Sequence, residues 1–198
     1  MDDGPPASGR PPESLSAPGL LLARWREPDV PALRGAIAEN RGHLSPWLVW
    51  ASDTSPMAAG SFVRESIRGW ERGERFEYGI WAAGADRTLL GAAGLMARLG
   101  PGALEAGYWV VAGSTRRRIA TRATAVLVAA AFELPGIERV EIHHDEANAA
   151  SAGVPPLLGF RRVGVFPRAL AGAPAETGRE VRWRIEAGES APAAPPAS

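Results

Sequence analysis

The sequence predicts an α/β fold, a sandwich of helices around one central sheet. Short apolar runs with the length of buried strands alternate with longer stretches of helix-forming residues, an order typical of layered α/β domains. No internal repeat and no long linker interrupts the pattern, so we expect one folded unit. The 198 residues, of which 45% are apolar, suffice to bury a core of ordinary size.

The predicted domain boundaries follow from composition. Residues 1–17 are rich in Pro, Gly and Ser with hardly any large apolar side chain, and we interpret them as a disordered tail. Residues 189–198 have the same character. The folded domain is therefore expected to span residues 18–188.

Within the domain we expect the order strand, two helices, three strands, helix, strand, helix and two strands. The predicted strands cover residues 20–25, 76–82, 88–96, 104–111, 139–143, 160–166 and 181–185. The predicted helices cover residues 29–40, with Asp29 as cap and Gly42 as end, 56–72 before Gly73, 119–134 before Pro135-Gly136, and 148–158 closed by Gly159.

Composition excludes several classes of protein. The chain has no cysteine, which rules out disulfides, thiolate metal sites and a cysteine nucleophile. Its formal net charge is zero, so no overall field attracts nucleic acid or an anionic membrane. The first residues are acidic with no apolar run after them, and the best apolar run, residues 123–132, is about half a membrane span. We expect a soluble, cytoplasmic protein.

The loop before the third predicted helix carries three consecutive arginines, Arg116, Arg117 and Arg118. A helix N-terminus offers free N–H groups and the positive end of the helix dipole, and guanidinium groups pair with phosphate oxygens in a fixed fork geometry. Three cations oppose that dipole unless an anion joins them. The pattern therefore predicts a site for a phosphorylated ligand; the alternative is a solvated run of charge.

Short motifs stand in a fixed order around this loop. Gly107-Tyr108-Trp109-Val110 precedes Arg116-Arg117-Arg118-Ile119-Ala120-Thr121, and Asn148-Ala149-Ala150-Ser151 precedes Leu158-Gly159-Phe160. They resemble the two halves of the acetyl-CoA motif of the GNAT superfamily of acetyltransferases. Residues 20–25 and 43–47 resemble the N-terminal half of its RimJ/RimL-like branch. The resemblance covers about 150 residues and implies a mixed, mostly antiparallel central sheet with helices on both faces.

The resemblance also implies a set of binding residues for acetyl-CoA, and no metal. Backbone groups after Tyr108 would bind the pantetheine arm, residues 116–121 would hold the pyrophosphate, Asn148 would hydrogen-bond the arm, and Ser151 would lie near the sulfur. The expected cofactor-binding residues are Trp109, Val110, Val111, Arg116, Arg117, Arg118, Ile119, Ala120, Thr121, Asn148 and Ser151.

The arginine-rich loop departs from the family pattern, Arg/Gln-x-x-Gly-x-Gly/Ala. Alignment on residues 119–121 places Thr115 at the first position and Arg118 at the glycine, and Arg116 also stands where many relatives have glycine. Glycine allows positive φ and a close approach of the backbone to phosphate. Either the arginine side chains obstruct that approach, or their guanidinium groups replace the lost contacts. Pro155-Pro156, within the last predicted helix, is a second departure.

Acetyl transfer to an amine needs a base for the nucleophile and a proton for the leaving thiolate. Glu105, two residues before Gly107 on the strand expected beside the reacting carbonyl, is the candidate base; the alternative is an exposed strand carboxylate. Ser151 is the candidate acid; the alternative is an ordinary serine at a helix N-terminus. No covalent enzyme intermediate is required.

Two other groups of residues invite functional interpretations. Residues 143–146, His-His-Asp-Glu, suggest a metal site, but neighbouring strand residues point to opposite faces, so we interpret them as a strand end followed by a solvated turn. Four tryptophans are candidates either for the lining of an acceptor pocket or for core packing: Trp47, Trp50, Trp70 and Trp81.

The predicted function is acetyl-CoA-dependent N-acetylation of a primary amine, on a protein N-terminus or a small molecule, by direct attack in a ternary complex. The RimJ/RimL-like resemblance favours the protein N-terminus, and because dimers are frequent in that branch a homodimer is expected. Two alternatives stay open. A catalytically degenerate protein of this fold, binding an acyl-CoA or a protein partner, is favoured by the missing loop glycines; the other is a structural protein without a cofactor.

Overall fold

The computed structural model describes residues 9–53, 55, 57–84, 87–168 and 172–189. They form one eight-stranded sheet with the strand order β1-β2-β3-β4-β5-β6-β8-β7. Neighbouring strands are antiparallel except β5 and β6, which are parallel. The strands are β1 (Ser14–Ala17), β2 (Leu20–Arg24), β3 (Arg75–Ala82), β4 (Leu89–Met96), β5 (Ala103–Val110), β6 (Arg139–Asp145), β7 (Arg161–Pro167) and β8 (Arg179–Glu186). The predicted mixed, mostly antiparallel sheet is confirmed.

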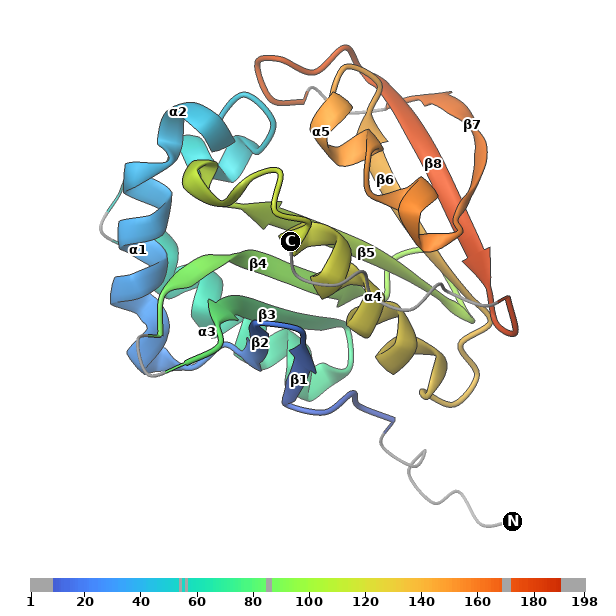
Figure 1. Ribbon diagram of the computed structural model, residues 1–198, viewed down its shortest axis with the longest axis horizontal. Coiled ribbons are helices and arrows are strands. Elements are labelled where there is room, and N and C mark those ends of the chain that lie inside the picture. The colour runs from blue at the N-terminus through green and yellow to red at the C-terminus, as the bar shows by residue number, and fades with distance from the viewer. Residues whose placement is uncertain (1–8, 54, 56, 85–86, 169–171, 190–198) are drawn as a thin grey trace.

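Helices cover both faces of this sheet, as Figure 1 shows. On one face, α1 (Val30–Glu39) packs against β4 and α3 (Ala58–Arg72) packs against β3. On the other face, α4 (Ile119–Phe132) crosses β5, β4 and β1. The remaining described helices and turns are short: α2 (Arg41–Leu44), α5 (Ala149–Ala152), η1 (Glu27–Asp29), η2 (Val49–Ser52), η3 (Ala112–Ser114) and η4 (Pro155–Leu158). Within the described part of the chain, no helix is both long and apolar enough to cross a membrane.

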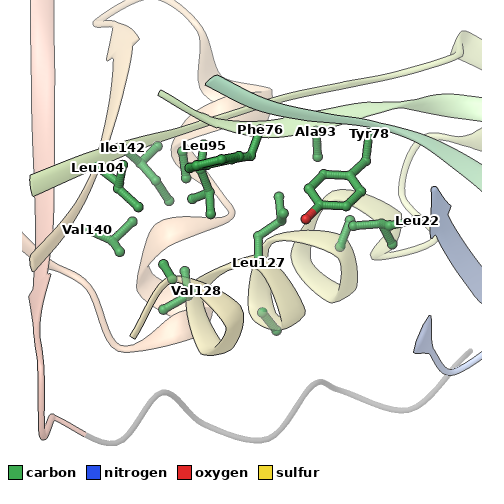
Figure 2. Packing of buried hydrophobic residues seen from close by; sticks show 14 of the residues in the cluster. Leu22, Phe76, Tyr78, Ala93, Leu95, Leu104, Leu127, Val128, Val140 and Ile142 are labelled. Atoms are coloured by element: carbon green, nitrogen blue, oxygen red, sulfur yellow. The ribbon is translucent and has the colours of Figure 1, made fainter. Parts of the chain in front are cut away.

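The alternation of side chains along the strands creates a separate core under each helical layer. On β3, Tyr78 points toward α4, whereas Trp81 points toward α1 and α3. Leu127 of α4 lies among apolar side chains of the strands above it, including Leu22 and Leu95 (Figure 2). Apolar layers therefore cover both faces of the sheet. A ligand site is expected at the ends of the strands, which these layers do not cover.

The N-terminal half differs from the sequence predictions at three points. The stretch predicted as a disordered tail, residues 1–17, contains β1, which pairs with β2; residues 1–8 lie outside the described part. Gly42 does not end α1, because α1 ends at Glu39 and Gly42 lies inside α2. Asp29 precedes α1 as predicted, but its carboxylate accepts the backbone N–H of Arg26 rather than one of the helix.

The C-terminal half differs in two further elements. The helix predicted over residues 148–158 is divided into α5 and η4, because Pro155 and Pro156 cannot donate the backbone bonds of a continuous helix. The strand predicted to end at His143 continues to Asp145, because every residue of β6 is paired with β8. His144 and Asp145 are buried, so the prediction of a solvated turn was wrong for these two residues.

Candidate active site

Strands β5 and β6 start side by side and then separate. Their pairing covers residues 103–105 of β5 and 139–141 of β6, although β5 continues to Val110 and β6 to Asp145. Beyond Glu105, the strand pairing of β5 in the described structure is with β4 alone. The other edge of β5 thus presents backbone N–H and C=O groups to a wedge between the strands, and an extended ligand can be held there by strand-like hydrogen bonds.

Helix α5 is tied across this wedge to β5. The hydroxyl of Tyr108 donates a hydrogen bond to the backbone carbonyl of Ser151 at 2.9 Å. Burial raises the pKa of the Tyr108 phenol above its ordinary value, so the hydroxyl keeps its proton as a donor. Asn148 caps α5 through Oδ1, which accepts the N–H of Ser151 at 3.1 Å. The amide NH₂ of Asn148 takes no part in that cap and can donate elsewhere.

The loop from β5 to α4 holds two arginines in a backbone conformation that favours glycine. Arg116 has φ 59° and Arg118, the N-cap of α4, has φ 52°. No other non-glycine residue in the described structure has a positive φ. A left-handed conformation costs a residue with a Cβ about 1–2 kcal/mol, and strain of this kind clusters at functional sites. The backbone therefore keeps the form of a glycine loop at both substituted positions.

Two hydrogen bonds fix this arginine loop, residues 111–118, one to the rest of the domain and one within the loop. Asn40, after α1, accepts the N–H of Ala112 through Oδ1 at 2.8 Å, and the Thr115 hydroxyl donates to the carbonyl of Ala112 at 2.9 Å. The side chains of residues 116–118 are exposed, and none forms an ion pair with another described residue. A cluster of unpaired cations thus stands at the N-terminus of α4.

The sheet face opposite α4 carries a carboxylate network at the narrow end of the wedge. Glu105 is buried there, and Nε of Arg98 donates to its Oε2 at 2.6 Å while Nη2 contacts its Oε1. The ring of His143 on β6 lies between three carboxylates. Its Nε2 is 2.8 Å from Oε2 of Glu141, and its Nδ1 is 3.7 Å from Oε2 of Glu105 and 3.4 Å from Oε1 of Glu180.

The carboxyl groups of this face differ in the direction in which their pKa is shifted. Burial alone would raise the pKa of Glu141, but hydrogen bonds from His143 and Arg184, with the charge of Arg184, outweigh it and lower the pKa. At Glu77 on β3 the balance is reversed, because burial raises the pKa more than the charge of Arg75 lowers it. Glu141 is therefore held in its ionised form, whereas Glu77 takes up a proton more readily than an ordinary glutamate.

A family model described as an acetyltransferase (GNAT) domain matches residues 19–161. The chain belongs to the GNAT family of acetyltransferases. The family predicted from the sequence motifs is thereby confirmed. A comparison with curated protein sequences found no match.

Solved GNAT structures share the fold of this chain at low sequence identity. RimL, a ribosomal L7/L12 α-N-protein acetyltransferase in complex with coenzyme A, has a TM-score of 0.79 and 22% identity, over 88% of this chain and 98% of that one. RimJ of Mycobacterium smegmatis, in complex with CoA-disulfide, has a TM-score of 0.78 and 22% identity, over 91% and 89%. The microcin C7 self-immunity acetyltransferase MccE, with acetyl-CoA and AMP, has a TM-score of 0.77 and 16% identity, over 85% and 92%.

This GNAT domain has an aromatic pocket on the face of α1 and α3, where β5 borders the wedge. Trp50 lies 5.9 Å from Trp109 of β5 and 6.4 Å from Phe62, between ring centroids. Asp53 adds one carboxylate. The other lining residues are Leu33, Ile37, Ser55, Met57, Ala58, Ala59 and Ser61. Of the four candidate tryptophans, Trp50 lines this pocket and is 42% exposed, Trp70 and Trp81 are core residues, and Trp47 is half-buried.

The GNAT site brings the sequence-predicted residues together in two places. Trp109, Val110 and the arginine loop follow the edge of the wedge, with Asn148 and Ser151 across it. Glu105 lies at its narrow end, buried rather than exposed. Sequence reasoning missed His143 as a neighbour of Glu105. The available signal was the spacing of Glu141 and His143, which places both on one face of a strand.

Proposed function

We propose that this GNAT domain transfers the acetyl group of acetyl-CoA to a primary amine, on a protein N-terminus or a small molecule. The observation that carries the proposal is the wedge between β5 and β6, joined to a loop with two left-handed residues at the start of α4. RimL, RimJ and MccE, which share the fold, hold coenzyme A, CoA-disulfide and acetyl-CoA respectively.

The residues of this chain fit acetyl-CoA. The unpaired edge of β5 suits the amide groups of a pantetheine arm, and Asn148 on α5 has an NH₂ group that its helix cap leaves available as a donor. The glycine-like backbone at Arg116 and Arg118 and the unpaired guanidinium groups suit a pyrophosphate. Trp109, Val110, Val111, residues 116–121, Asn148 and Ser151 therefore form the proposed binding surface.

Bound acetyl-CoA supplies an activated acyl carbon and a thiolate leaving group. The chain's own groups supply the proton transfers. Glu105 takes a proton from the attacking amine as its C–N bond forms, directly or through His143 at 3.7 Å. When the C–S bond breaks, the Ser151 hydroxyl gives a proton to sulfur and takes one back from water, and Glu105 releases the amine proton to solvent. A free backbone N–H of β5 stabilises the charge that develops on the carbonyl oxygen.

The acceptor approaches, in this proposal, from the face opposite α4. That face holds both the carboxylate network, which attracts an ammonium group, and the aromatic pocket, which suits an apolar side chain. We propose that the pocket binds the apolar group beside the reacting amine. Trp50→Ala is then expected to raise KM for acceptors with an apolar side chain several-fold and to leave KM for glycine-like acceptors unchanged.

A second candidate function is a non-catalytic acyl-CoA-binding protein. One observation favours it: Arg98 donates hydrogen bonds to both carboxylate oxygens of Glu105, so the proposed base is already paired with a cation. Cytoplasmic location and a homodimer stay predictions from the sequence, and light scattering behind a sizing column tests the second.

Calorimetric titration of acetyl-CoA into the full chain tests binding, with Arg118→Gly in parallel. We expect micromolar binding by the parent and a loss of up to about tenfold in Arg118→Gly, since one guanidinium contact is removed. Binding by Arg118→Gly alone would show that the arginine blocks the loop and would end the proposal.

Release of free thiol, measured with a disulfide reagent, tests turnover. Because the chain has no cysteine, every thiol detected comes from coenzyme A. We expect thiol release with peptides or small amines that carry a free primary amine, and none with their N-acetylated forms as controls. Acetyl-CoA binding without turnover on a broad acceptor panel would favour the second candidate.

A further inference from the structure

Helix α5 is too short to hold its own position. It has four residues, Ala149–Ala152, and none of their side chains is buried. A helix of one turn is unstable on its own, because that turn fixes several residues for very few hydrogen bonds. The segment is anchored at its ends: the N–H of Asn148 donates to the carbonyl of Asp145 at 2.9 Å, and Val154 is buried in the core between the sheet and α4. Its distance from β5 therefore depends on a contact across the wedge.

Tyr108 makes that contact. Among the described residues, the hydrogen bond from its hydroxyl to the carbonyl of Ser151 is the only one that joins β5 to α5. The ring of Tyr108 packs against the apolar core on the α4 side of the sheet. A tyrosine side chain has only two rotatable bonds, so a packed ring is a rigid spacer. Tyr108 thus sets the distance between the edge of β5 and α5.

The backbone of Ser151 connects this contact to two side chains. Its carbonyl accepts the Tyr108 hydroxyl, and its N–H donates to Oδ1 of Asn148 at 3.1 Å. Because the amide of Asn148 is planar, a bond that fixes Oδ1 also fixes the direction of the NH₂ group. The hydroxyl of Ser151 belongs to the residue that Tyr108 holds. One phenol therefore orients both α5 side chains to which the proposed function gives a role.

We propose that Tyr108 is a positioning residue for acetyl transfer, which holds Ser151 and Asn148 at the wedge through the backbone of Ser151. It acts through that carbonyl and not on the reacting atoms. The proposal rests on the proposed function, because only acetyl transfer gives Ser151 and Asn148 their roles. Burial raises the pKa of the phenol, so the hydroxyl stays a donor throughout the pH range of an assay.

Tyr108→Phe removes the hydroxyl and keeps the ring, and Tyr78→Phe is its matched control. These two residues are the only tyrosines of the chain. Tyr78 also donates to a backbone carbonyl at 2.9 Å, that of Pro12, and burial also raises its pKa. It lies on β3, which β4 separates from β5. Each variant loses one neutral hydrogen bond, so each should lower the Tm by about 2–4 °C.

Hydrogen exchange in the protein without ligand tests the contact itself. The N–H groups of Ser151 and Ala152 both donate to Asn148, so their exchange reports on α5. Tyr108→Phe is expected to speed their exchange about tenfold, and Tyr78→Phe to leave it unchanged despite a similar loss in Tm. Unchanged exchange in Tyr108→Phe, or equal acceleration in both variants, would overturn the proposal. Because no acetyl-CoA is present, this result is independent of acetyl transfer.

Binding and turnover test what the contact does for the reaction. Tyr108→Phe is expected to weaken acetyl-CoA binding in calorimetry about threefold, through Asn148, and to lower kcat about tenfold, through Ser151. KM for the acceptor should not change, because the acceptor approaches from the face opposite α4. Tyr78→Phe should leave all three quantities unchanged. Equal losses in both tyrosine variants, or none in Tyr108→Phe, would overturn the proposal.

The Ser151→Ala background separates the two routes. There, Tyr108→Phe should still weaken acetyl-CoA binding about threefold but lower kcat no further, since the side chain that it positions for proton transfer is gone. A further tenfold loss of kcat would show that Tyr108 does not act through Ser151. A parent that binds acetyl-CoA without turnover would contradict the proposed function alone, because exchange in α5 and acetyl-CoA affinity would still decide the role of Tyr108.

Discussion

The arginines at the start of α4 differ from those around the carboxylate network in what neutralises them. Around the network, each guanidinium is paired with a glutamate: Arg98 with Glu105, Arg139 and Arg184 with Glu141, and Arg182 with Glu180. At α4, Arg122 and residues 116–118 have no ion pair within the described structure. The chain has 22 basic and 22 acidic residues, so carboxylates are not scarce. An unpaired cluster in a balanced chain indicates an anion from outside.

The two regions also differ in backbone conformation. Arg116 and Arg118 adopt left-handed conformations, whereas the paired arginines around the network have ordinary backbone angles. Strain and uncompensated charge thus coincide at α4, while the network combines relaxed strands with satisfied ion pairs. The charges of the network are therefore balanced by ion pairs within the fold, whereas those at the start of α4 are left for a ligand to balance.

Substitution of Glu105 is expected to have the largest effect, and it tests whether the carboxylate network has a role beyond structure. Glu105→Gln is expected to lower kcat about 10²–10⁴-fold through loss of the general base. Arg98→Gln is the matched variant, since it breaks the same ion pair and leaves the carboxylate. It should lose less than about tenfold in the thiol-release assay. Equal losses in both variants would show that Glu105 acts only by pairing with Arg98.

Substitution of Asp145 tests how much a buried carboxylate of the network region contributes to the free energy of unfolding. It accepts hydrogen bonds from the N–H groups of Ala147, Thr177 and Gly178 and from the Thr177 hydroxyl, and so holds the segment before β8 against β6. Asp145→Asn is expected to lower the free energy of unfolding in urea by about 2 kcal/mol at neutral pH, because hydrogen bonds to a charged group are lost.

The pH dependence of that difference follows from the Asp145 pKa. Burial alone would raise this pKa, but the hydrogen bonds from Ala147, Thr177 and Gly178 outweigh it and lower the pKa. The stabilisation is complete above the unfolded-state pKa, near pH 4, and is lost as pH falls through the lower folded-state value. Parent and Asp145→Asn should therefore converge in stability at acid pH. A constant difference down to about pH 3 would contradict the role of the charge.

Arg118→Gly tests the backbone strain of the arginine loop, the other region of the comparison. Glycine relieves the left-handed strain, so the variant is expected to unfold with a free energy about 1 kcal/mol higher. Arg116→Gly should behave alike. Arg117→Gly is the control, because Arg117 has no positive φ and its replacement removes the same charge at a cost of about 0.5–1 kcal/mol. Equal changes in all three variants would mean that charge rather than strain sets the stability of the loop.

The sequence predicted what depends on local pattern and missed what depends on distant partners. The order of strands and helices from β2 onward and the motif around the arginine loop could be predicted, because periodicity and spacing carry them. The left-handed angles of Arg116 and Arg118 could not, since the fold imposes them against residue preference. The role of Asp145 depends on Thr177, 32 positions away, and β1 exists only because β2 offers it an edge.

The smallest expected effect concerns Arg179, whose pair with Glu146 looks strong by distance alone. Nε lies 2.6 Å from Oε2, yet the side chains are 60% and 41% exposed. Solvent screens such a pair, and holding two long side chains costs entropy, so Arg179→Gln is expected to change the free energy of unfolding by less than about 0.5 kcal/mol. Urea unfolding at low and high salt measures it. A loss of 2 kcal/mol, as large as that expected for Asp145→Asn, would mean that distance rather than burial determines how much a charged group contributes to stability.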